Sequence, residues 1–311
     1  MTVGVLYSSV PQPTQDKVDK MWYYTIMTKK MRRVLFYCAL VLFLAVSYVV
    51  LLYAQGYQYS FSDGRFVRTG AISLKVNTEA SILLDGEVVK GTSFLGNNAS
   101  IDALLPGSYI VAVEKDGYSK WQKKVVVEEG FVQDFSNVLI LPQAGADQDN
   151  VRSEIQNLLY PPIPTPTPAG SPGTTPKVTS RPTPPPKPTA SPTPDQTAPY
   201  FLDGDALYVQ GGLGPERIAS NVKKVVRSND GQKIAWISNN QLWVYWLSNS
   251  GYQPYRVAGD IMLLARFPNP IKTLVWFRDS DHLALDASLA GQGGLKVVEI
   301  DTRGGINIIN F

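Results

Sequence analysis

The residue types that most often carry out chemistry are scarce in this chain. His282 is the one histidine and Cys38 the one cysteine among 311 residues. A disulfide within the chain needs two cysteines, and zinc or non-haem iron centres generally need several His or Cys ligands. His282 precedes a predicted strand and is accompanied by no Ser or Cys nucleophile motif. We therefore predict no catalytic, cofactor-binding or metal-binding residue, and no cofactor.

Carboxylate pairs and tryptophans are the remaining candidates. Asp203-Gly204-Asp205 and Asp279-Ser280-Asp281 do not continue into the Asp-x-Asp-x-Asp-Gly loop of a calcium site, and turn chemistry explains both. The tryptophans of the same region could form a sugar-stacking surface, but burial in a β-domain is their commoner role. They are Trp236, Trp243, Trp246 and Trp276. Two carboxyls ~5–10 Å apart in a cleft would instead favour a glycosidase-like hydrolase.

The positive charge of the chain is concentrated at its N-terminal end. The formal net charge is +3, yet residues 1–33 hold six Lys or Arg against two Asp, so the other residues sum to −1. A nucleic-acid-binding surface needs a basic stripe or a helix-turn-helix pattern, and the sequence has neither. We therefore expect no nucleic-acid partner.

Residues 34–54 form an uncharged apolar stretch of 21 residues. As a helix they would be ~32 Å long, which matches the core of a bilayer. A cleaved signal peptide has an apolar region of ~7–15 residues and small residues before the cleavage site. Cleavage after Ala54 would place Leu52 at the −3 position, so we predict an uncleaved transmembrane helix.

The orientation of this helix follows from its flanking charges. Lys29, Lys30, Arg32 and Arg33 precede it, and the residues after it are uncharged up to Asp63. The positive-inside rule then places a basic stub, residues 1–33, in the cytoplasm. The juxtamembrane segment, residues 55–70, and everything after it are expected outside the cytoplasm. Its alternating aromatic residues suit either an interfacial belt or a lead-in strand.

Residues 71–142 show the strongest fold signal. Apolar and polar residues alternate in runs of five to eight, as in half-buried strands. The turn signals Asp85-Gly86, Pro106-Gly107 and Asp116-Gly117 separate these runs. The pattern predicts a small antiparallel β-sandwich.

The turns of this region resemble those of the PEGA domain. Asp85-Gly86, Gly91-Thr92, the Leu-Pro-Gly-x-Tyr turn ending at Tyr109, and Gly117-Tyr118 fall on matching positions. Ser93 stands where the family has proline, and Thr78-Glu79-Ala80 stands where it has Pro-Glu-Gly-Ala. The resemblance implies a compact extracytoplasmic β-module beside a membrane anchor, with no catalytic residues to carry over.

Two connecting segments follow. Residues 143–160 predict a short helix with Val151, Ile155, Leu158 and Leu159 on one face, capped by Asp149 or Asn150, that docks on the sandwich or frays. Residues 161–199 hold 15 of the 23 prolines and predict a disordered linker rich in polyproline II. A passive spacer, a stalk that spans a wall or carries O-linked sugars, and a docking site for a proline-reading domain all remain open.

Residues 200–311 return to a β pattern. Strands are predicted at 206–209, 241–245 and 295–299, the last two preceded by strands at 233–236 and 282–285. Residues 228–236 resemble the Ser-x-Asp-Gly turn and strand of TolB-like and WD-type propellers. Two to three blades cannot close a ring. We therefore expect an incomplete, truncated or degenerate β-propeller-like domain, or else an open sandwich whose edge pairs with another chain.

These observations predict a mainly β, single-pass membrane protein of the cell envelope, with its N-terminus in the cytoplasm. Binding or scaffolding, without enzymatic activity, is the expected work of its PEGA-like and propeller-like modules. The expected partners are the lipid bilayer and a cell-wall or surface polysaccharide or another envelope protein. An envelope enzyme using carboxylates of the C-terminal domain is the alternative. A sensor is a third possibility, although residues 1–33 are short for signalling.

Overall fold

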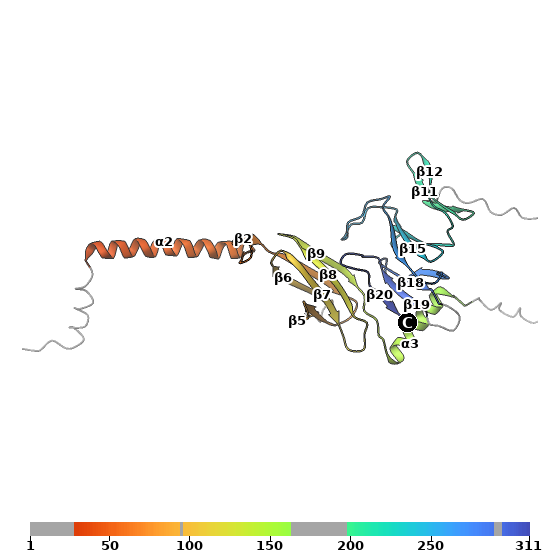
Figure 1. The fold of residues 1–311 in the computed structure, drawn as a ribbon, viewed down its shortest axis with the longest axis horizontal. Coiled ribbons are helices and arrows are strands. Elements are labelled where there is room, and N and C mark those ends of the chain that lie inside the picture. The colour runs from red at the N-terminus through yellow and green to blue at the C-terminus, as the bar shows by residue number, and fades with distance from the viewer. Residues whose placement is uncertain (1–27, 94–95, 163–197, 289–293) are drawn as a thin grey trace, which may run out of the picture. The chain divides into compact units, whose positions relative to one another are not determined.

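A computed structural model describes residues 28–93, 96–162, 198–288 and 294–311 (Figure 1). The chain is mainly β-structure and divides into two units, residues 1–68 and 69–311. Most of the expected basic stub and nearly all of the predicted proline-rich linker lie outside the described residues. We describe each unit by itself.

The first unit contains the apolar helix α2 (Lys29–Ala54). The Oγ1 atom of Thr28 accepts a hydrogen bond from the N–H of Met31 at 3.3 Å and caps the helix start. The helix therefore begins five residues before the predicted span and includes its basic flank. None of its residues is buried, and it is long and apolar enough to cross a membrane. A membrane anchor and a signal sequence both have these properties.

A two-stranded hairpin follows the helix. It pairs β1 (Tyr57–Ser60) with β2 (Arg65–Arg68), and Tyr57 lies opposite Arg68. The Tyr59 ring contacts Phe61 and Phe66 edge-on, with centroid separations of 5.1 Å and 5.3 Å. The juxtamembrane aromatic residues thus belong to a separate hairpin and do not lead directly into the sandwich.

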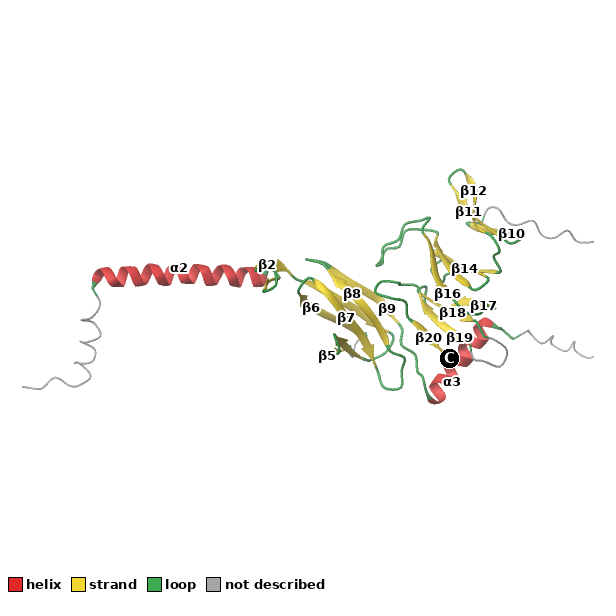
Figure 2. Cartoon of the chain, in the orientation of Figure 1, coloured by secondary structure: helices red, strands yellow, loops and turns green. Residues whose placement is uncertain are grey.

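The second unit begins with two sheets that share one apolar core, as the alternating sequence pattern predicts (Figure 2). One sheet has the order β5-β4-β7-β8 and the other the order β6-β3-β9. The strands are β3 (Gly70–Val76), β4 (Ser81–Leu84), β5 (Glu87–Gly91), β6 (Asn98–Leu104), β7 (Gly107–Glu114), β8 (Trp121–Val127) and β9 (Val132–Val138).

The expectation of a purely antiparallel sandwich is wrong for one strand pair. Strands β3 and β9 run parallel, with Ala71 opposite Val132. A parallel pair needs a long crossover, and here the chain makes it by building the whole opposite sheet between the two strands. Gly70, the first residue of β3, lies close to the end of β8. A Cβ atom added to Gly70 would lie 2.5 Å from a Val127 methyl carbon, so the position has no room for a side chain.

The motif residues of the sandwich form its turns and its packing. Asp85 and Gly86 both have positive φ, 50° and 90°, as a tight Asp-Gly hairpin requires. The Tyr109 hydroxyl donates to the Leu105 carbonyl at 2.8 Å, and the Thr92 hydroxyl accepts from the Ala80 N–H at 3.0 Å. Asp85, Gly86, Thr92 and Tyr109 thus each have a structural role, in a turn or in a hydrogen bond that holds one.

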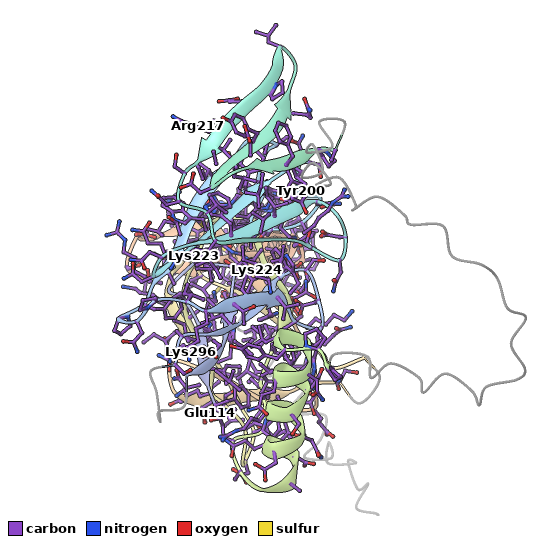
Figure 3. The ribbon with its side chains drawn as sticks, turned by 90° about the vertical axis from the view of Figure 1, so that its right-hand side faces the viewer. Glu114, Tyr200, Arg217, Lys223, Lys224 and Lys296 are labelled. Carbon is purple, nitrogen blue, oxygen red and sulfur yellow. The ribbon has the colours of Figure 1, made fainter. Side chains whose placement is uncertain are left out.

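Helix α3 (Gly145–Leu159) confirms the predicted short helix, corrects its cap and adds a second docking surface to the predicted one. It begins after Ala144, without a side-chain cap, so neither Asp149 nor Asn150 caps it. Its buried face, Val151, Ile155 and Leu159, shares one apolar cluster with two parts of the chain. One part is Leu139 and Leu141, at the end of the predicted sandwich segment, and the other includes Phe277, Ala284 and Val297 of the C-terminal region. The helix is drawn in green in Figure 3. Leu158, predicted on the buried face, is 44% exposed.

The C-terminal region consists of three successive antiparallel meanders, each with its strands in sequence order. The predicted strands at 206–209, 233–236, 241–245, 282–285 and 295–299 are confirmed. The first meander contains β10 (Tyr200–Asp203), β11 (Ala206–Gly211) and β12 (Gly214–Ala219). The second contains β13 (Lys224–Arg227), β14 (Lys233–Ser238), β15 (Gln241–Trp246) and β16 (Ile261–Arg266). The third contains β17 (Thr273–Trp276), β18 (His282–Asp286), β19 (Leu295–Glu299) and β20 (Ile308–Asn310). The described residues form no closed barrel.

Candidate functional site

Buried ionisable side chains gather where strands β8 and β9 of the sandwich meet the second and third meanders. We call this region the sandwich–meander interface. It comprises Lys123, Asn137, Lys233, Tyr252, Asp281, Glu299, Asp301, Arg303 and Asn307, which contribute the hydrogen bonds described below. Burying charges is costly unless they are paired, so this cluster is the candidate site.

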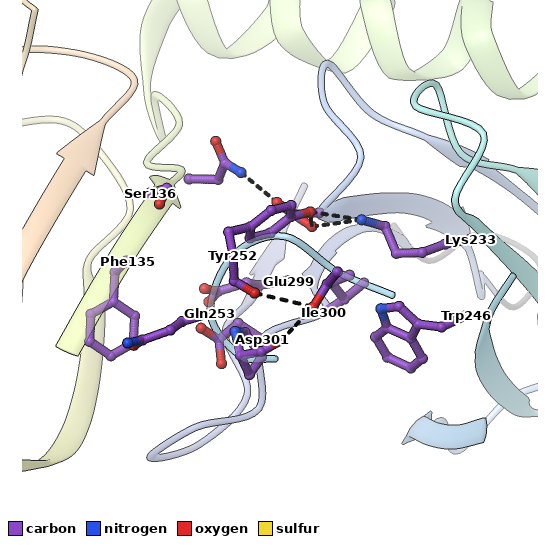
Figure 4. A pocket seen from close by; sticks show the side chains of 13 residues that line it. Phe135, Ser136, Lys233, Trp246, Tyr252, Gln253, Glu299, Ile300 and Asp301 are labelled. Carbon is purple, nitrogen blue, oxygen red and sulfur yellow. Dashed lines mark hydrogen bonds and ion pairs between the residues drawn. The ribbon is translucent and has the colours of Figure 1, made fainter. Parts of the chain in front are cut away.

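Lys233 is at the centre of one half of the interface (Figure 4). Its Nζ atom lies 2.8 Å from the Tyr252 hydroxyl and 3.2 Å from carboxylate oxygens of both Asp230 and Asp281. Tyr252 donates its own hydroxyl proton to Asp281 at 2.7 Å. The other carboxylate oxygen of Asp281 accepts from the side-chain amide of Asn137, on strand β9. Lys233 and Asp281 therefore join the second meander, the third meander and the sandwich.

The environment fixes the protonation of these groups. Burial would raise the pKa of Asp230, but hydrogen bonds from Ser228 and Gln232 and the charge of Lys233 lower it overall. Burial and the neighbouring Asp281 carboxylate raise the pKa of Tyr252. The Tyr252 phenol therefore stays protonated and serves as a hydrogen-bond donor.

His282 forms a second pair beside this cluster. Its Nδ1 atom lies 2.8 Å from an Asp279 oxygen, and the other Asp279 oxygen accepts the backbone N–H groups of Asp281 and His282 at 2.8 Å. Burial would lower the pKa of His282, but the hydrogen bond and charge of Asp279 raise it overall. Asp279-Ser280-Asp281 thus forms a turn, as predicted, and also supplies the carboxylates of two ion pairs, with His282 and with Lys233.

Lys123 is at the centre of the other half of the interface. Its Nζ atom lies 3.2 Å from Glu299 Oε2 and donates to the backbone carbonyls of Asp301 and Gly305. The same Glu299 oxygen accepts from Trp121 Nε1 at 3.1 Å and from Asn307 Nδ2 at 2.8 Å. Burial raises the pKa of Glu299, although the Lys123 charge opposes this.

Arg303 connects the third meander to strand β9. Its guanidinium group binds the Asp301 carboxylate at 2.7 Å, the Asp134 carbonyl at 2.7 Å and Gln253 Oε1 at 2.8 Å. It also lies over the Phe135 ring, 4.2 Å from the centroid. The planar group of Arg303 therefore links the third meander to strand β9 through hydrogen bonds and a ring contact.

The cavity enclosed by the interface is small. It has a volume of about 30 Å³ and is lined by Phe135, Lys233, Trp246, Tyr252, Asp281, Glu299 and neighbouring residues (Figure 4). Pockets for drug-sized ligands have volumes of roughly 300–1,000 Å³, whereas a cavity of this size suits one or two water molecules. The buried charges therefore face one another and not an open cleft.

The other candidates from the sequence lie elsewhere. Asp203 ends strand β10 and Asp205 lies in the turn before β11, and neither is among the interface residues named above. Burial of the tryptophans is confirmed for Trp236, Trp246 and Trp276. Trp243 is half-buried and stacks on Trp236 with a centroid separation of 6.0 Å.

Sequence reasoning missed most of the interface. The side chains of Lys123, Asn137, Glu299 and Arg303 were not singled out. One signal was available for Lys123, because it occupies an inward-facing position in the alternating strand β8, whose burial pattern is regular.

Among the described residues, no group of three or more His, Cys, Asp or Glu side chains is arranged to hold a metal ion.

Comparisons with known proteins do not assign the chain to a family. No protein-family model and no curated protein sequence matches the chain. A solved structure, that of a periplasmic gluconolactonase of Pseudomonas aeruginosa, aligns with 82% of this chain and 77% of its own at 11% identity. The TM-score of that alignment is 0.23, which supports no conclusion about shared fold or activity.

Proposed function

We propose that this protein is a non-enzymatic, single-pass membrane protein that displays a β-structured ectodomain for binding or scaffolding at the cell envelope. The observation that carries this proposal is the state of the buried charges. In the described residues of the interface, Lys123, Lys233, Asp281 and Glu299 are paired with other protein groups around a cavity of about 30 Å³. Such an arrangement suits holding two modules together.

The anchor part of the proposal rests on helix α2. Its residues 34–54 carry no charge, and Lys29, Lys30, Arg32 and Arg33 precede them. The positive-inside rule favours a cytoplasmic N-terminus and an ectodomain outside the cytoplasm. Only residues 55 and 56 separate α2 from strand β1, so the β1–β2 hairpin follows the apolar helix directly along the chain.

The module assignments rest on topology and turns. The two-sheet unit with its Asp85-Gly86 hairpin and Tyr109 turn suits a PEGA-like domain. Three successive meanders with strands in sequence order suit incomplete propeller blades, because each blade of a propeller is such a meander. Both modules would offer their exposed surfaces to a partner, as a binding or scaffolding role requires.

A groove beside Trp243 is the favoured place for a polysaccharide partner. The groove has a volume of about 180 Å³ and combines the Trp243 ring with the polar side chains of Ser220, Ser238 and Gln241. Aromatic faces with adjacent amide and hydroxyl groups suit sugar rings. The glycosidase-like alternative has less support, since Asp281 and Glu299 are engaged in ion pairs and their cavity has no room for a sugar ring.

Fractionation of cells that express the full chain tests the anchor. We expect the intact protein in the membrane fraction, resistant to alkaline carbonate and released by detergent. Protease added to intact cells is expected to cleave the ectodomain. The double variant Val41→Arg/Leu44→Arg should lose membrane retention, because a charge at the centre of a span costs about 2.5–3.5 kcal/mol per residue. Recovery of the intact wild-type protein in the soluble fraction would refute the anchor.

A pull-down of the detergent-solubilised chain on peptidoglycan and on immobilised glycans tests the binding role. Retention that is lost in Trp243→Ala and kept in the matched variant Trp276→Phe would support polysaccharide binding. No retention on either material would favour a scaffolding role with a protein partner.

A further inference from the structure

Lys123, Glu299 and Asn307 form an arrangement that the display function does not require. Glu299 Oε2 accepts hydrogen bonds from Lys123 Nζ at 3.2 Å and from Asn307 Nδ2 at 2.8 Å. A backbone hydrogen bond from the Glu299 N–H to the Asn307 carbonyl, 3.1 Å long, keeps the acid and the amide side by side. An amine, a carboxyl group and a carboxamide thus meet at one oxygen atom.

We propose that Lys123 and Asn307 join in an intramolecular amide bond, formed without a cofactor and with Glu299 as the proton carrier. In this reaction, Lys123 Nζ forms a bond to Asn307 Cγ, and the bond from Cγ to Nδ2 breaks. The amide nitrogen leaves as ammonia. The product ties strand β8 of the sandwich covalently to the third meander. This inference goes beyond the proposed display function and does not depend on it.

The burial of the pair prepares the nucleophile. The side chain of Lys123 is 0% exposed and that of Glu299 is 6% exposed. The proposed reaction begins with transfer of one proton from the Lys123 ammonium to the Glu299 carboxylate, which yields a neutral amine and a neutral acid. The raised pKa of Glu299 acts in the same direction. The carbonyls of Asp301 and Gly305 accept the two remaining amine protons and hold the amine beside Glu299.

The same contacts serve the leaving group. Glu299 lies within hydrogen-bond distance of Asn307 Nδ2, so its proton passes to the nitrogen that departs. The backbone N–H of Gln122 lies 3.5 Å from Asn307 Oδ1, the oxygen that gains negative charge during the attack. Glu299 then takes the excess proton from Lys123 Nζ and gives it to ammonia. Ammonium leaves and the carboxylate is regenerated, so atoms and charge balance.

Lys233, Asp281 and Asn137 provide an internal comparison. They also bring together an amine, a carboxylate and a carboxamide. However, Lys233 Nζ lies between two carboxylates, those of Asp230 and Asp281, and Asn137 is exposed. We therefore expect one crosslink, at Lys123.

Intact-mass measurement of the purified full chain tests the proposal. The expected mass is lower than the sequence mass by one ammonia, about 17 Da. Proteolysis should yield a branched peptide that contains both Lys123 and Asn307. A chain of full mass with Lys123 in a linear peptide would overturn the proposal. Loss of ammonia confined to the Asn307 peptide, as in succinimide formation, would overturn it as well.

Variants identify the roles of the three residues. Lys123→Arg, Asn307→Ala and Glu299→Gln are each expected to keep the full mass. Asn310→Ala is the matched control, because Asn310 also accepts a hydrogen bond from a lysine, Lys296, but on an exposed edge. It should lose ammonia like the wild type. Loss of ammonia in Lys123→Arg would refute the assignment.

A cleavage assay provides a readout that does not depend on the variants' stability. A protease site is inserted within residues 161–199 of the full chain, and the cut protein is run on a reducing denaturing gel. A crosslink between Lys123 and Asn307 holds the two fragments in one band. Separation of the wild-type fragments would contradict the proposal, and their separation in Lys123→Arg alone would support it.

Discussion

The sandwich core and the sandwich–meander interface are both buried, yet they are built from opposite kinds of side chains. The core of the sandwich consists of apolar residues such as Ile72, Ile82 and Val111. The interface buries Lys123, Lys233 and the carboxylates that pair with them. Apolar packing tolerates many similar arrangements, whereas charge pairs and hydrogen bonds are satisfied by few. The core thus stabilises the module, and we infer that the interface selects how the modules dock.

The largest effect is expected from removing one buried charge. Lys233→Met should lower the free energy of unfolding by about 3–5 kcal/mol, because it leaves the Asp281 carboxylate buried without its cation. Chemical denaturation of the full chain in detergent measures this. The exposed Lys223→Met is the matched control, with an expected change within about 0.5 kcal/mol (Figure 3).

A double variant sharpens the comparison between core and interface. Lys233→Met/Asp281→Leu replaces the pair by apolar groups and should recover much of the lost stability. If the double variant recovers this stability, the Lys233–Asp281 pair mainly determines how the meanders and the sandwich dock and adds little to the free energy of unfolding. If the single variant is as stable as the wild type, the contrast between core and interface fails.

The next effect is a pH dependence at His282. Its folded-state pKa is raised above 6.5, so its stabilisation is complete below pH 6.5 and is lost as pH rises through the raised value. His282→Gln should therefore cost more stability at about pH 5.5 than at about pH 8.5. Denaturation at the two pH values checks this. The charged groups that act on His282 are Asp279, Asp281 and Glu299. Adding Glu299→Gln to the wild type and to His282→Gln separates the pH dependence due to Glu299 from that due to His282.

The smallest effect is expected at the surface. Arg278 and Glu154 form a 2.7 Å ion pair between α3 and the third meander, and their side chains are 39% and 38% exposed. Glu154→Gln should cost about 0.5 kcal/mol at low salt and less at high salt, since water and ions screen exposed charges. A cost as large as that of Lys233→Met would contradict the distinction between buried and exposed pairs.

Much of the fold follows from local patterns. The alternation along 121–127 and the Asp85-Gly86 turn predict strands and a hairpin that the structure contains. The parallel pairing of β3 with β9 was not predictable, because strand direction depends on how the whole intervening sheet is placed. The docking of α3 likewise depended on a partner surface more than 100 residues further along the chain.

The sequence by itself determined the periodicity of the strands, the turns, the apolar helix and its basic flank, because each depends on neighbouring residues. Only the tertiary structure decided which charges meet. Lys123 and Glu299 are 176 positions apart, and nothing in either local pattern identifies the partner. The desolvation penalty of a buried charge is offset only when the complete fold brings its counterion close. The positions of these pairs therefore depend on the whole tertiary structure.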